Sequence, residues 1–185
     1  MQILPSGQYF GHEKRTGTLG SITFAETDYT FPFVDWHAHE RPYFTFILQG
    51  HLWEGGRQRS YDLEAGAMLF HYQDTPHQNR LCQQATRGFH LDIDLKWFTQ
   101  FDVHLSNFGG IHWIRNPKIR LAMEQVYLQS FDPETAAMDT ALVDLFNTLN
   151  EPAIIKADRI KPKWVKLVQE AIEASDEFIP LSDLA

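Results

Sequence analysis

The chain is poor in cysteine and lacks a long apolar segment at its start. Cys82 is the single cysteine, so an internal disulfide is excluded. The first fifteen residues, MQILPSGQYFGHEKR, contain no apolar run of the kind that a signal peptide or a membrane span needs. Both features are typical of proteins in a reducing compartment. We therefore expect a cytoplasmic protein with no membrane contact.

Positive charge is also scarce. Sixteen Lys and Arg stand against 24 Asp and Glu, which gives a net charge of −8 at pH 7. Because the DNA backbone is itself negative, this balance opposes DNA binding by the chain as it stands. The sequence has no G-x-S-x-G elbow, no cysteine beside a basic run and no phosphate-cradling glycine loop. Nothing in it therefore supports a hydrolase, a kinase or a dinucleotide-dependent enzyme.

Aromatic and imidazole side chains are plentiful. The chain carries fourteen Phe, five Trp and nine His within 185 residues, and 43% of the residues are hydrophobic. A chain of this size can bury one proper core without disulfides. The aromatic content suits an internal pocket or an interface, and a large aromatic core explains it equally well.

Residues 19–98 show the pattern of many short strands separated by turns, which favours a sandwich or a barrel. The segment from Tyr43 to Trp53 is aromatic and β-branched, and we expect Gly55 and Gly56 to supply the positive φ angles of a tight hairpin. Farther on, FHLDIDLKWF alternates strictly. This alternation predicts a half-buried strand with one apolar face, made of Phe89, Leu91, Ile93 and Leu95.

The periodicity becomes helical after Pro117, a residue that is tolerated at a helix start. A first helix carries Ile119, Met123, Val126 and Tyr127 at helical spacing. The FDP break that follows predicts an antiparallel pair with a second helix over 133–150, whose stripe is Ala137, Ala141, Leu142, Leu145, Phe146 and Leu149. Residues 151–163 are rich in proline and charge and are expected to be a linker.

The most specific local feature is His37-Ala38-His39, with Tyr43 close behind it and His77 farther along. Side chains at even separation on one strand point to the same face. We therefore expect His37, His39 and Tyr43 to face one cavity, with His77 completing the cluster. A bulge at Pro42 is the main way in which this parity would fail.

This histidine pattern resembles the first motif of the cupin superfamily, which runs H-x-H, a short spacer, Glu, six residues, Gly. Gly50 stands in the glycine position, whereas Tyr43 occupies the place of the acidic ligand. Gly66 and His77 match the second motif, although His71-Tyr72-Gln73 stands where Pro-x-Gly is usual. The resemblance covers about residues 34–95 and implies a double-stranded β-helix, or jelly-roll, barrel.

Three neutral imidazoles at His37, His39 and His77 are able to hold Zn²⁺, Ni²⁺ or Fe²⁺ with open positions, which would make a metal-dependent cupin enzyme of the dioxygenase or isomerase type. The missing glutamate counts against a metal. Histidines that bond to each other, to water or to an effector explain the pattern without one. We expect no resident metal, no cofactor and no catalytic residue. His90, Asp92 and Asp94 either line the cavity or form a solvated strand face.

The end of the chain resembles the entry to the DNA-binding domain of the AraC family of bacterial transcription regulators. The residues that carry this resemblance are Trp164, Val165, Val168 and Ile172, followed by Leu181, Leu184 and Ala185. An ordinary amphipathic helix docked at the C-terminus gives a similar pattern. The order of a degenerate cupin, a helix pair, a linker and this segment matches the family over nearly the whole chain.

The resemblance implies a mainly β fold, in which a cupin barrel is followed by two antiparallel helices and a C-terminal helix. It implies an arm at 1–18, an effector-binding barrel at 19–98, a helical dimerisation segment at 99–150, a linker at 151–163 and, at 164–185, the start of a helix-turn-helix domain. DNA contact would come only through the remainder of that domain.

The function expected from the sequence is ligand sensing and dimerisation in an AraC-type regulator, without catalysis. A small-molecule effector would bind in a pocket formed by Trp36, His37, His39, Tyr43 and His77. A homodimer would form through Val126, Tyr127, Leu142, Leu145 and Phe146. Two alternatives stay open, namely the metal-dependent cupin enzyme and a carbohydrate-binding or storage cupin.

Overall fold

The structure is a computed structural model that describes residues 1–105, 109–132 and 134–150. The linker expected at 151–163 and the helix-turn-helix segment expected at 164–185 lie outside the described residues.

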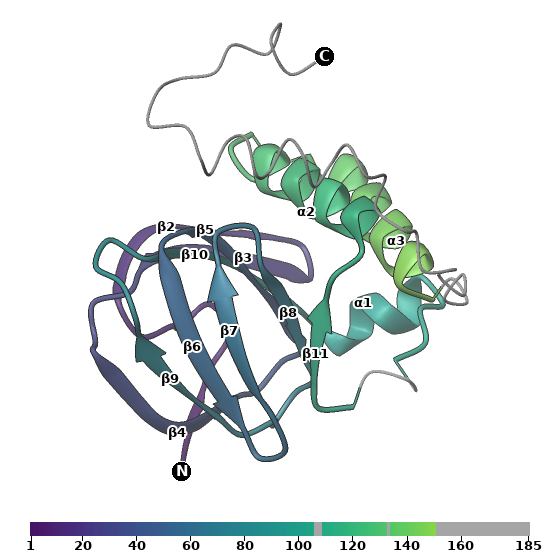
Figure 1. The fold of residues 1–185 in the computed structure, drawn as a ribbon. Coiled ribbons are helices and arrows are strands. Elements are labelled where there is room, and N and C mark those ends of the chain that lie inside the picture. Colours follow the sequence, from purple (N-terminus) through teal and green to yellow (C-terminus); the bar gives the residue numbers. More distant parts are fainter. Residues whose placement is uncertain (106–108, 133, 151–185) are drawn as a thin grey trace, which may run out of the picture. The chain divides into compact units, whose positions relative to one another are not determined.

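Two β-sheets make up most of the fold (Figure 1). The first sheet contains, in spatial order, β1 (Gln2–Leu4), β4 (Phe33–His39), β9 (His77–Leu81), β6 (His51–Gly56) and β7 (Ser60–Glu64). The second contains β11 (Ile111–Ile114), β8 (Met68–His71), β5 (Tyr43–Gln49), β10 (Arg87–Ile93), β3 (Ile22–Asp28) and β2 (His12–Leu19). This mainly β, cupin-like arrangement confirms the predicted fold class.

The chain passes from one sheet to the other at Gly50. The sequence predicts a single strand from Tyr43 to Trp53, but this stretch is divided into β5 and β6, which belong to different sheets. Gly50 has a φ of +81°, and a Cβ atom there would lie 2.6 Å from the Cα of Thr86. Only glycine combines this backbone conformation with so close an approach.

The hairpin predicted around Gly55 is present, because β6 pairs antiparallel with β7 and Gly55 lies opposite Ser60. Its turn is nevertheless built differently from the prediction. Gly55 and Gly56 both lie within β6, and neither has a positive φ.

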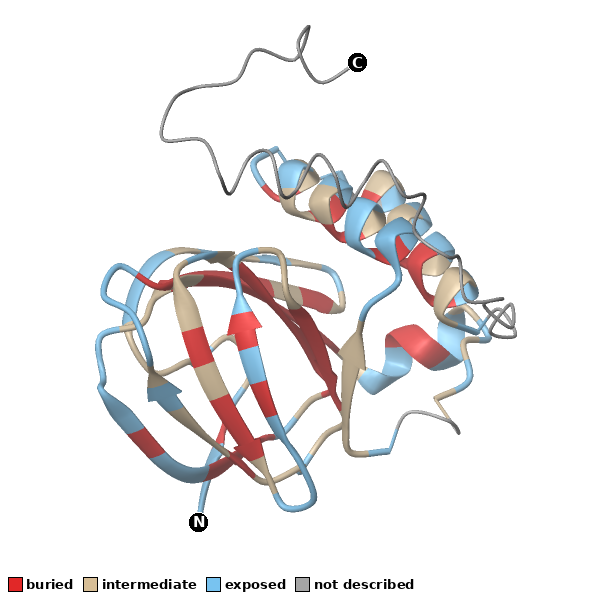
Figure 2. Ribbon diagram, in the orientation of Figure 1, coloured by how far each residue is buried: buried red, intermediate tan, exposed pale blue. Residues whose placement is uncertain are grey.

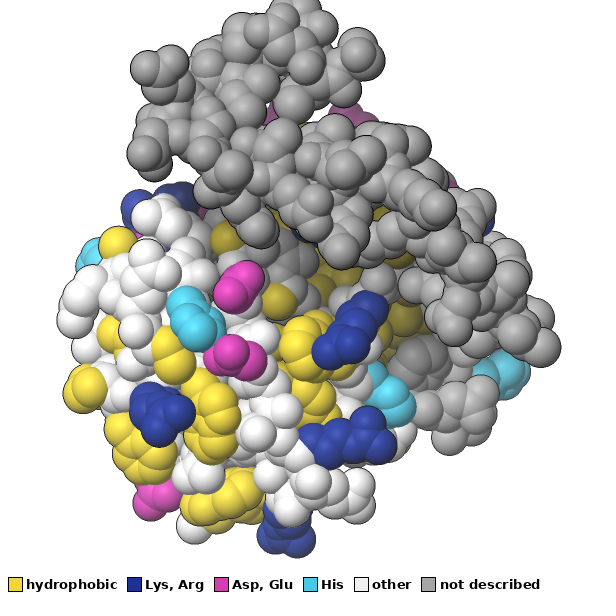
Figure 3. Space-filling model, in the orientation of Figure 1, with side chains coloured by type: hydrophobic (Ala, Val, Ile, Leu, Met, Phe, Trp, Pro, Cys, Tyr) yellow, Lys and Arg dark blue, Asp and Glu magenta, His cyan; other side chains and the backbone are white. Residues whose placement is uncertain are grey.

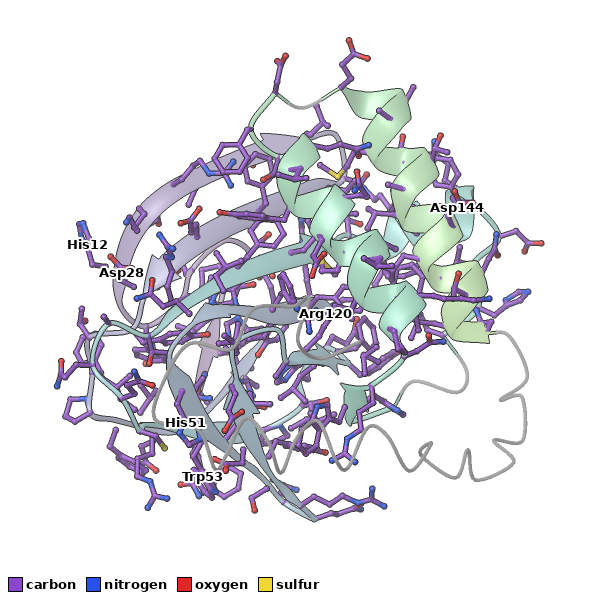
Figure 4. The ribbon with its side chains drawn as sticks, turned by 45° about the horizontal axis from the view of Figure 1, so that its top comes forward. His12, Asp28, His51, Trp53, Arg120 and Asp144 are labelled. Atoms are coloured by element: carbon purple, nitrogen blue, oxygen red, sulfur yellow. The ribbon has the colours of Figure 1, made fainter. Side chains whose placement is uncertain are left out.

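Three helices cover the outer face of the six-stranded sheet (Figure 1). They are α1 (Leu95–Gln100), α2 (Pro117–Gln129) and α3 (Thr135–Asn150). Asn116 caps α2 by accepting a hydrogen bond from the backbone N–H of Lys118, and Pro117 follows in the first turn, as expected for a helix start. Figure 4 shows α2 and α3 side by side, with Arg120 and Asp144 marking the two helices.

The main apolar core lies between these helices and the sheet. Phe146 of α3 packs against Phe44 and Phe70, with ring centroids 5.5 and 6.0 Å apart. Strand β10 is buried on both faces, because Phe89, Leu91 and Ile93 lie under the helices while His90 and Asp92 face the other way. The half-buried strand predicted for this segment is therefore wrong (Figure 2).

This core corrects the expected dimerisation residues. Val126, Leu142, Leu145 and Phe146 are all fully buried within one chain, and Tyr127 is half-buried with its ring against Phe89. The physical reason is that the helix stripes cover a sheet face that is itself apolar. These side chains therefore hold the helices against the sheet of the same chain.

The N-terminal residues are part of the sheets, in contrast to the separate arm expected at 1–18. Strand β1 pairs in parallel with β4, with Gln2 opposite His37 and Leu4 opposite His39. Strand β2 pairs with β3, and Figure 4 shows His12 and Asp28, which are register partners, at the same end of these two strands.

Strand β2 also contacts the end of α2. The guanidinium of Arg15 donates hydrogen bonds to the backbone carbonyl of Ser130 at 2.6 Å and to its hydroxyl at 2.9 Å. The same group lies 3.9 Å from the ring centroid of Phe131 and forms an ion pair with Glu26 at 3.6 Å. Arg15 thus satisfies a terminal carbonyl of α2, where positive charge is favourable.

The face in Figure 3 mixes apolar, basic, acidic and histidine side chains over the strands. Among the described residues, no helix has both the length and the apolar character needed to cross a membrane.

Candidate functional site

The interior between the two sheets is lined by imidazole and phenol rings. His37 and His39 come from β4, Tyr43 from β5 and His77 from β9, and all four are buried. The ring centroids of His37 and His77 are 4.1 Å apart, and those of His39 and Tyr43 are 4.4 Å apart. The structure thus brings four of the five predicted pocket residues together.

The reason for this convergence differs from the predicted one. Strand β4 ends at His39 and β5 begins at Tyr43 in the opposite sheet, so strand parity does not relate the two residues. They meet because the two sheets face each other. The irregularity in β4 falls between Val34 and His37, before the histidines and not at Pro42.

Trp36 was predicted to line the pocket, and the structure contradicts this. It is 37% exposed and does not line the cavity. Trp36 lies in the irregular stretch of β4 between Val34 and His37, where Asp35 and Trp36 are both exposed. The irregularity therefore turns Trp36 outward although Val34 and His37 both line the cavity.

Two histidines have fixed orientations. The Nδ1–H of His37 donates to the carbonyl oxygen of Asp35 at 2.9 Å, and that of His77 donates to the carbonyl oxygen of Thr75 at 3.0 Å. Each ring therefore turns its Nε2 lone pair toward the interior. At His77 this lone pair accepts a hydrogen bond from the Tyr43 hydroxyl at 3.0 Å.

Sequence reasoning missed Glu54 of β6 and considered His71 of β8 only as a departure from the cupin motif. Glu54 is 2% exposed and His71 is fully buried, and the Oε1 atom of Glu54 lies 3.4 Å from the Nε2 atom of His71. Glu54 has the same parity on β6 as the buried Leu52, which was the available signal for an inward carboxyl group.

Tyr9, from the segment between β1 and β2, fills the remaining interior. Its ring stacks on His90 with centroids 3.7 Å apart and on His39 at 4.9 Å. Its hydroxyl donates to Asp92, which also accepts from the Ser6 hydroxyl at 3.0 Å. With Tyr9 in place the free space in this cavity measures about 20 Å³, which is room for one water molecule or an ion.

Burial controls the charge of the site. It lowers the pKa of His77 and of His90 to about 3, and it lowers the pKa values of His37, His39 and His71 as well, so these imidazoles are neutral at pH 7. Burial raises the pKa of Glu54 to about 8, which favours its neutral form.

The cupin fold implies a metal site, and these residues fit one. The ligand atoms of His37, His39 and His77 lie within 4.8 Å of one another, and those of Glu54, His71 and His77 do so as well. Neutral imidazoles whose second nitrogen is held by a backbone carbonyl are the usual ligands of divalent transition metals. Because His77 belongs to both groups, the two sets compete for it.

Comparison with known proteins identifies the class of fold first. No protein-family model and no curated protein matches the chain. Solved structures do match.

Two of these structures match most of this chain. Apo ToxT K231A from Vibrio cholerae is 9% identical with a TM-score of 0.59, and the match covers 90% of this chain and 69% of that one. The AraC-like transcriptional activator CuxR is 9% identical with a TM-score of 0.50, and the match covers 88% of this chain and 65% of that one. The described chain therefore has the fold of AraC-like regulators with a cupin-like domain.

Proposed function

We propose that this chain is the ligand-sensing and dimerising part of an AraC-type transcription regulator. The observation that carries the proposal is the interior pocket in which His37, His39, Tyr43 and His77 converge and Tyr9 stacks on His39. The fold shared with CuxR gives this pocket a regulatory setting, because CuxR is an AraC-like transcriptional activator.

The ligand is a small molecule with hydrogen-bonding groups. The Nδ1 atom of His39 is buried and makes no hydrogen bond, so it offers a ligand an unused partner. The rings of Tyr43 and Phe10 also line the cavity and would cover the apolar part of a ligand. A cavity of about 20 Å³ does not hold a molecule of metabolite size, so such a ligand must displace a lining side chain, and we propose that this side chain is Tyr9.

A metal-dependent cupin enzyme is the second candidate, and the grouping of His37, His39 and His77 favours it. A bound divalent ion would supply Lewis-acid chemistry there. We favour the regulator because Tyr43 stands at the position where the cupin motif has its acidic metal ligand, and because the structures that match most of this chain include the AraC-like activator CuxR.

Dimerisation would use the outward side of α2 and the turn after it. Leu121, Leu128 and Phe131 are about three-fifths exposed there, at 61%, 58% and 60%. Large exposed apolar side chains grouped on one element are typical of an interface. A second copy of the chain is the proposed occupant, in place of the pairing through buried residues that the sequence suggested.

DNA binding would belong to a helix-turn-helix domain, of which the resemblance places the start at 164–185. The chain as given is acidic, which opposes DNA binding on its own. The proposed location is the cytoplasm, where such a regulator reaches its DNA. Control of DNA binding requires that the ligand bind two arrangements of the protein with different affinity.

A thermal-shift screen of small polar and aromatic metabolites on the 185-residue chain tests the proposal. We expect hits whose stabilisation is lost in His39→Ala and Tyr43→Phe and is retained in His51→Ala, a histidine that lies outside the cavity on β6. Calorimetry on the hits should show a loss of about 1–3 kcal/mol in each pocket variant. Hits that bind the pocket variants unchanged would place the ligand elsewhere and overturn the proposal.

A further inference from the structure

A second cluster of buried polar side chains lies beside the pocket. Glu54 comes from β6, His71 from β8 and His77 from β9, so the cluster joins the two sheets. Each of the three residues is at most 2% exposed. His71 does not line the cavity itself but stacks on Tyr43, with ring centroids 4.3 Å apart.

Several atoms of this cluster are buried without a hydrogen bond. The Oε2 atom of Glu54 accepts a hydrogen bond from Asn79 at 3.1 Å, but its Oε1 atom makes none. Neither ring nitrogen of His71 makes one. Folded proteins rarely leave buried polar atoms unsatisfied, and a group of them in one place calls for an ion or a water molecule between them.

The donor set is that of a transition-metal site. One carboxylate oxygen and two imidazole nitrogens lie within 4.8 Å of one another. Asn79 holds the outer oxygen of Glu54, and the Thr75 carbonyl holds the outer nitrogen of His77. Such outer contacts fix the ligand atoms of metal sites in place.

We propose that Glu54, His71 and His77 bind a divalent transition-metal ion of the Zn²⁺ or Ni²⁺ class. Glu54 thereby supplies, from β6, the carboxylate that is absent at Tyr43 in the histidine motif. The inference goes beyond the proposed function, since ligand sensing as proposed above needs no metal.

Tyr43 acts as a competitor in this arrangement. Its hydroxyl occupies the Nε2 atom of His77, which is the nitrogen that the metal requires. Metal binding must therefore break the hydrogen bond between Tyr43 and His77. Tyr43 contacts His71 and His77 but is not one of the proposed ligands. Removing its hydroxyl should therefore make metal binding easier.

The test is a metal titration of the purified, chelator-stripped 185-residue chain, in competition with a chromophoric chelator. We expect one Zn²⁺ or Ni²⁺ per chain. Glu54→Gln and His71→Asn should each weaken binding at least about tenfold, a loss of the size seen when a metal site is damaged. Tyr43→Phe should bind at least as tightly as the wild type.

Two further variants separate this site from its neighbours. His37→Asn should retain binding, because His37 belongs only to the other histidine set. Cys82→Ser should also retain it, which excludes the surface group of His51, Asp62 and Cys82. If His37→Asn abolishes binding while His71→Asn and Glu54→Gln keep it, the ion sits at the histidine motif and the inference is wrong.

A wild-type chain that takes up no metal in excess Zn²⁺ and Ni²⁺ would also overturn the inference and would leave water as the occupant. Circular dichroism of every variant checks the fold. If Glu54→Gln or His71→Asn fails to fold, the absorption spectrum of the Co²⁺-loaded wild-type protein identifies the ligands instead. We expect the spectrum of a site with two imidazoles and one carboxylate, and the spectrum of a three-imidazole site would contradict the inference. These readouts involve neither effector nor promoter, so this inference and the proposed function can fail separately.

Discussion

The hydroxyl of Tyr9 donates a hydrogen bond to the carboxylate of Asp92, a residue 83 positions later in the chain. The backbone N–H of Gly7 and the hydroxyl of Ser6 donate to the same carboxylate. Asp92 thus anchors a short polar segment across the barrel and holds the Tyr9 ring against His90.

Replacing Tyr9 with alanine should cost roughly 3 kcal/mol of unfolding free energy, because it empties a site that the remaining side chains cannot fill. Tyr9→Phe keeps the ring and should cost less, about 1–3 kcal/mol, since only the hydrogen bond to Asp92 is lost. Urea denaturation measures both. Added p-cresol should stabilise Tyr9→Ala but not the wild type; equal effects on the two proteins would show that the ring does not fill the pocket.

Gly50 and Gly20 form a matched pair for testing the crossing between the sheets. Both have positive φ, at +81° and +58°, but a Cβ atom would strike Thr86 at Gly50 and would meet open space at Gly20. Gly20→Ala should cost about 1 kcal/mol from backbone strain alone. Gly50→Ala should cost several times more, as measured by thermal denaturation. Similar costs would mean that Thr86 moves aside.

Leu145 and Leu128 separate the core of the helices from their surface. Leu145 is fully buried and Leu128 is 58% exposed. Leu145→Asp should unfold the chain, because a buried unpaired charge is strongly unfavourable. Leu128→Asp should keep the circular dichroism spectrum and convert the proposed dimer to a monomer in light scattering. A dimer that survives Leu128→Asp would move the interface away from α2.

Acid should destabilise the metal-free protein. Burial lowers the pKa of His77 and His90 from 6.5 to about 3, so the unfolded chain takes up protons first as the pH falls. The contribution of these two residues to the free energy of unfolding is complete above pH 6.5. It is lost toward pH 3, at about 1.4 kcal/mol per pH unit for each residue. Urea denaturation at several pH values should therefore show that the free energy of unfolding depends less steeply on pH in His90→Gln than in the wild type. An unchanged slope would contradict a buried neutral His90.

In the same metal-free protein, Glu54 makes the free energy of unfolding change with pH in the opposite direction. Burial raises its pKa from 4.5 to about 8, so its contribution is complete below pH 4.5 and is lost as the pH rises to about 8. Together with the histidines, this places the stability maximum near neutral pH. Glu54→Gln should remove the decline between pH 7 and pH 8, and a decline that persists in this variant would have another cause.

The local pattern of the sequence was sufficient for the strands and helices but not for their surroundings. The alternation around His90 correctly separates Phe89 and Leu91 from His90 and Asp92, yet it cannot show that both faces are covered. For the same reason the stripe containing Leu145 predicts a helix correctly and its partner incorrectly. Which surface buries an apolar helix stripe depends on the tertiary packing. The sequence of the stripe does not show whether it packs on a second copy or on the chain's own sheet.

The site was predictable where the motif supplied the residues. His37, His39 and His77 were found from the cupin motif, whereas Trp36 was misplaced because the sequence does not show the irregularity in β4 before His37. Glu54 and Tyr9 lie outside any motif and reach the interior only through the pairing of distant strands. Their roles follow from the three-dimensional arrangement alone.

The side chain that fills the pocket and the side chain that holds the end of α2 are six positions apart in one stretch of chain. Tyr9 lies on His90, and Arg15 bonds to Ser130. We expect a ligand that expels Tyr9 to strain the short stretch of backbone that leads to Arg15 and so to weaken the Arg15 contact with the helix. If it does, thermodynamic reciprocity requires that a partner which tightens the Arg15 contact weaken ligand binding by the same factor. Residues 9–15 would then connect occupancy of the interior with the proposed dimer surface.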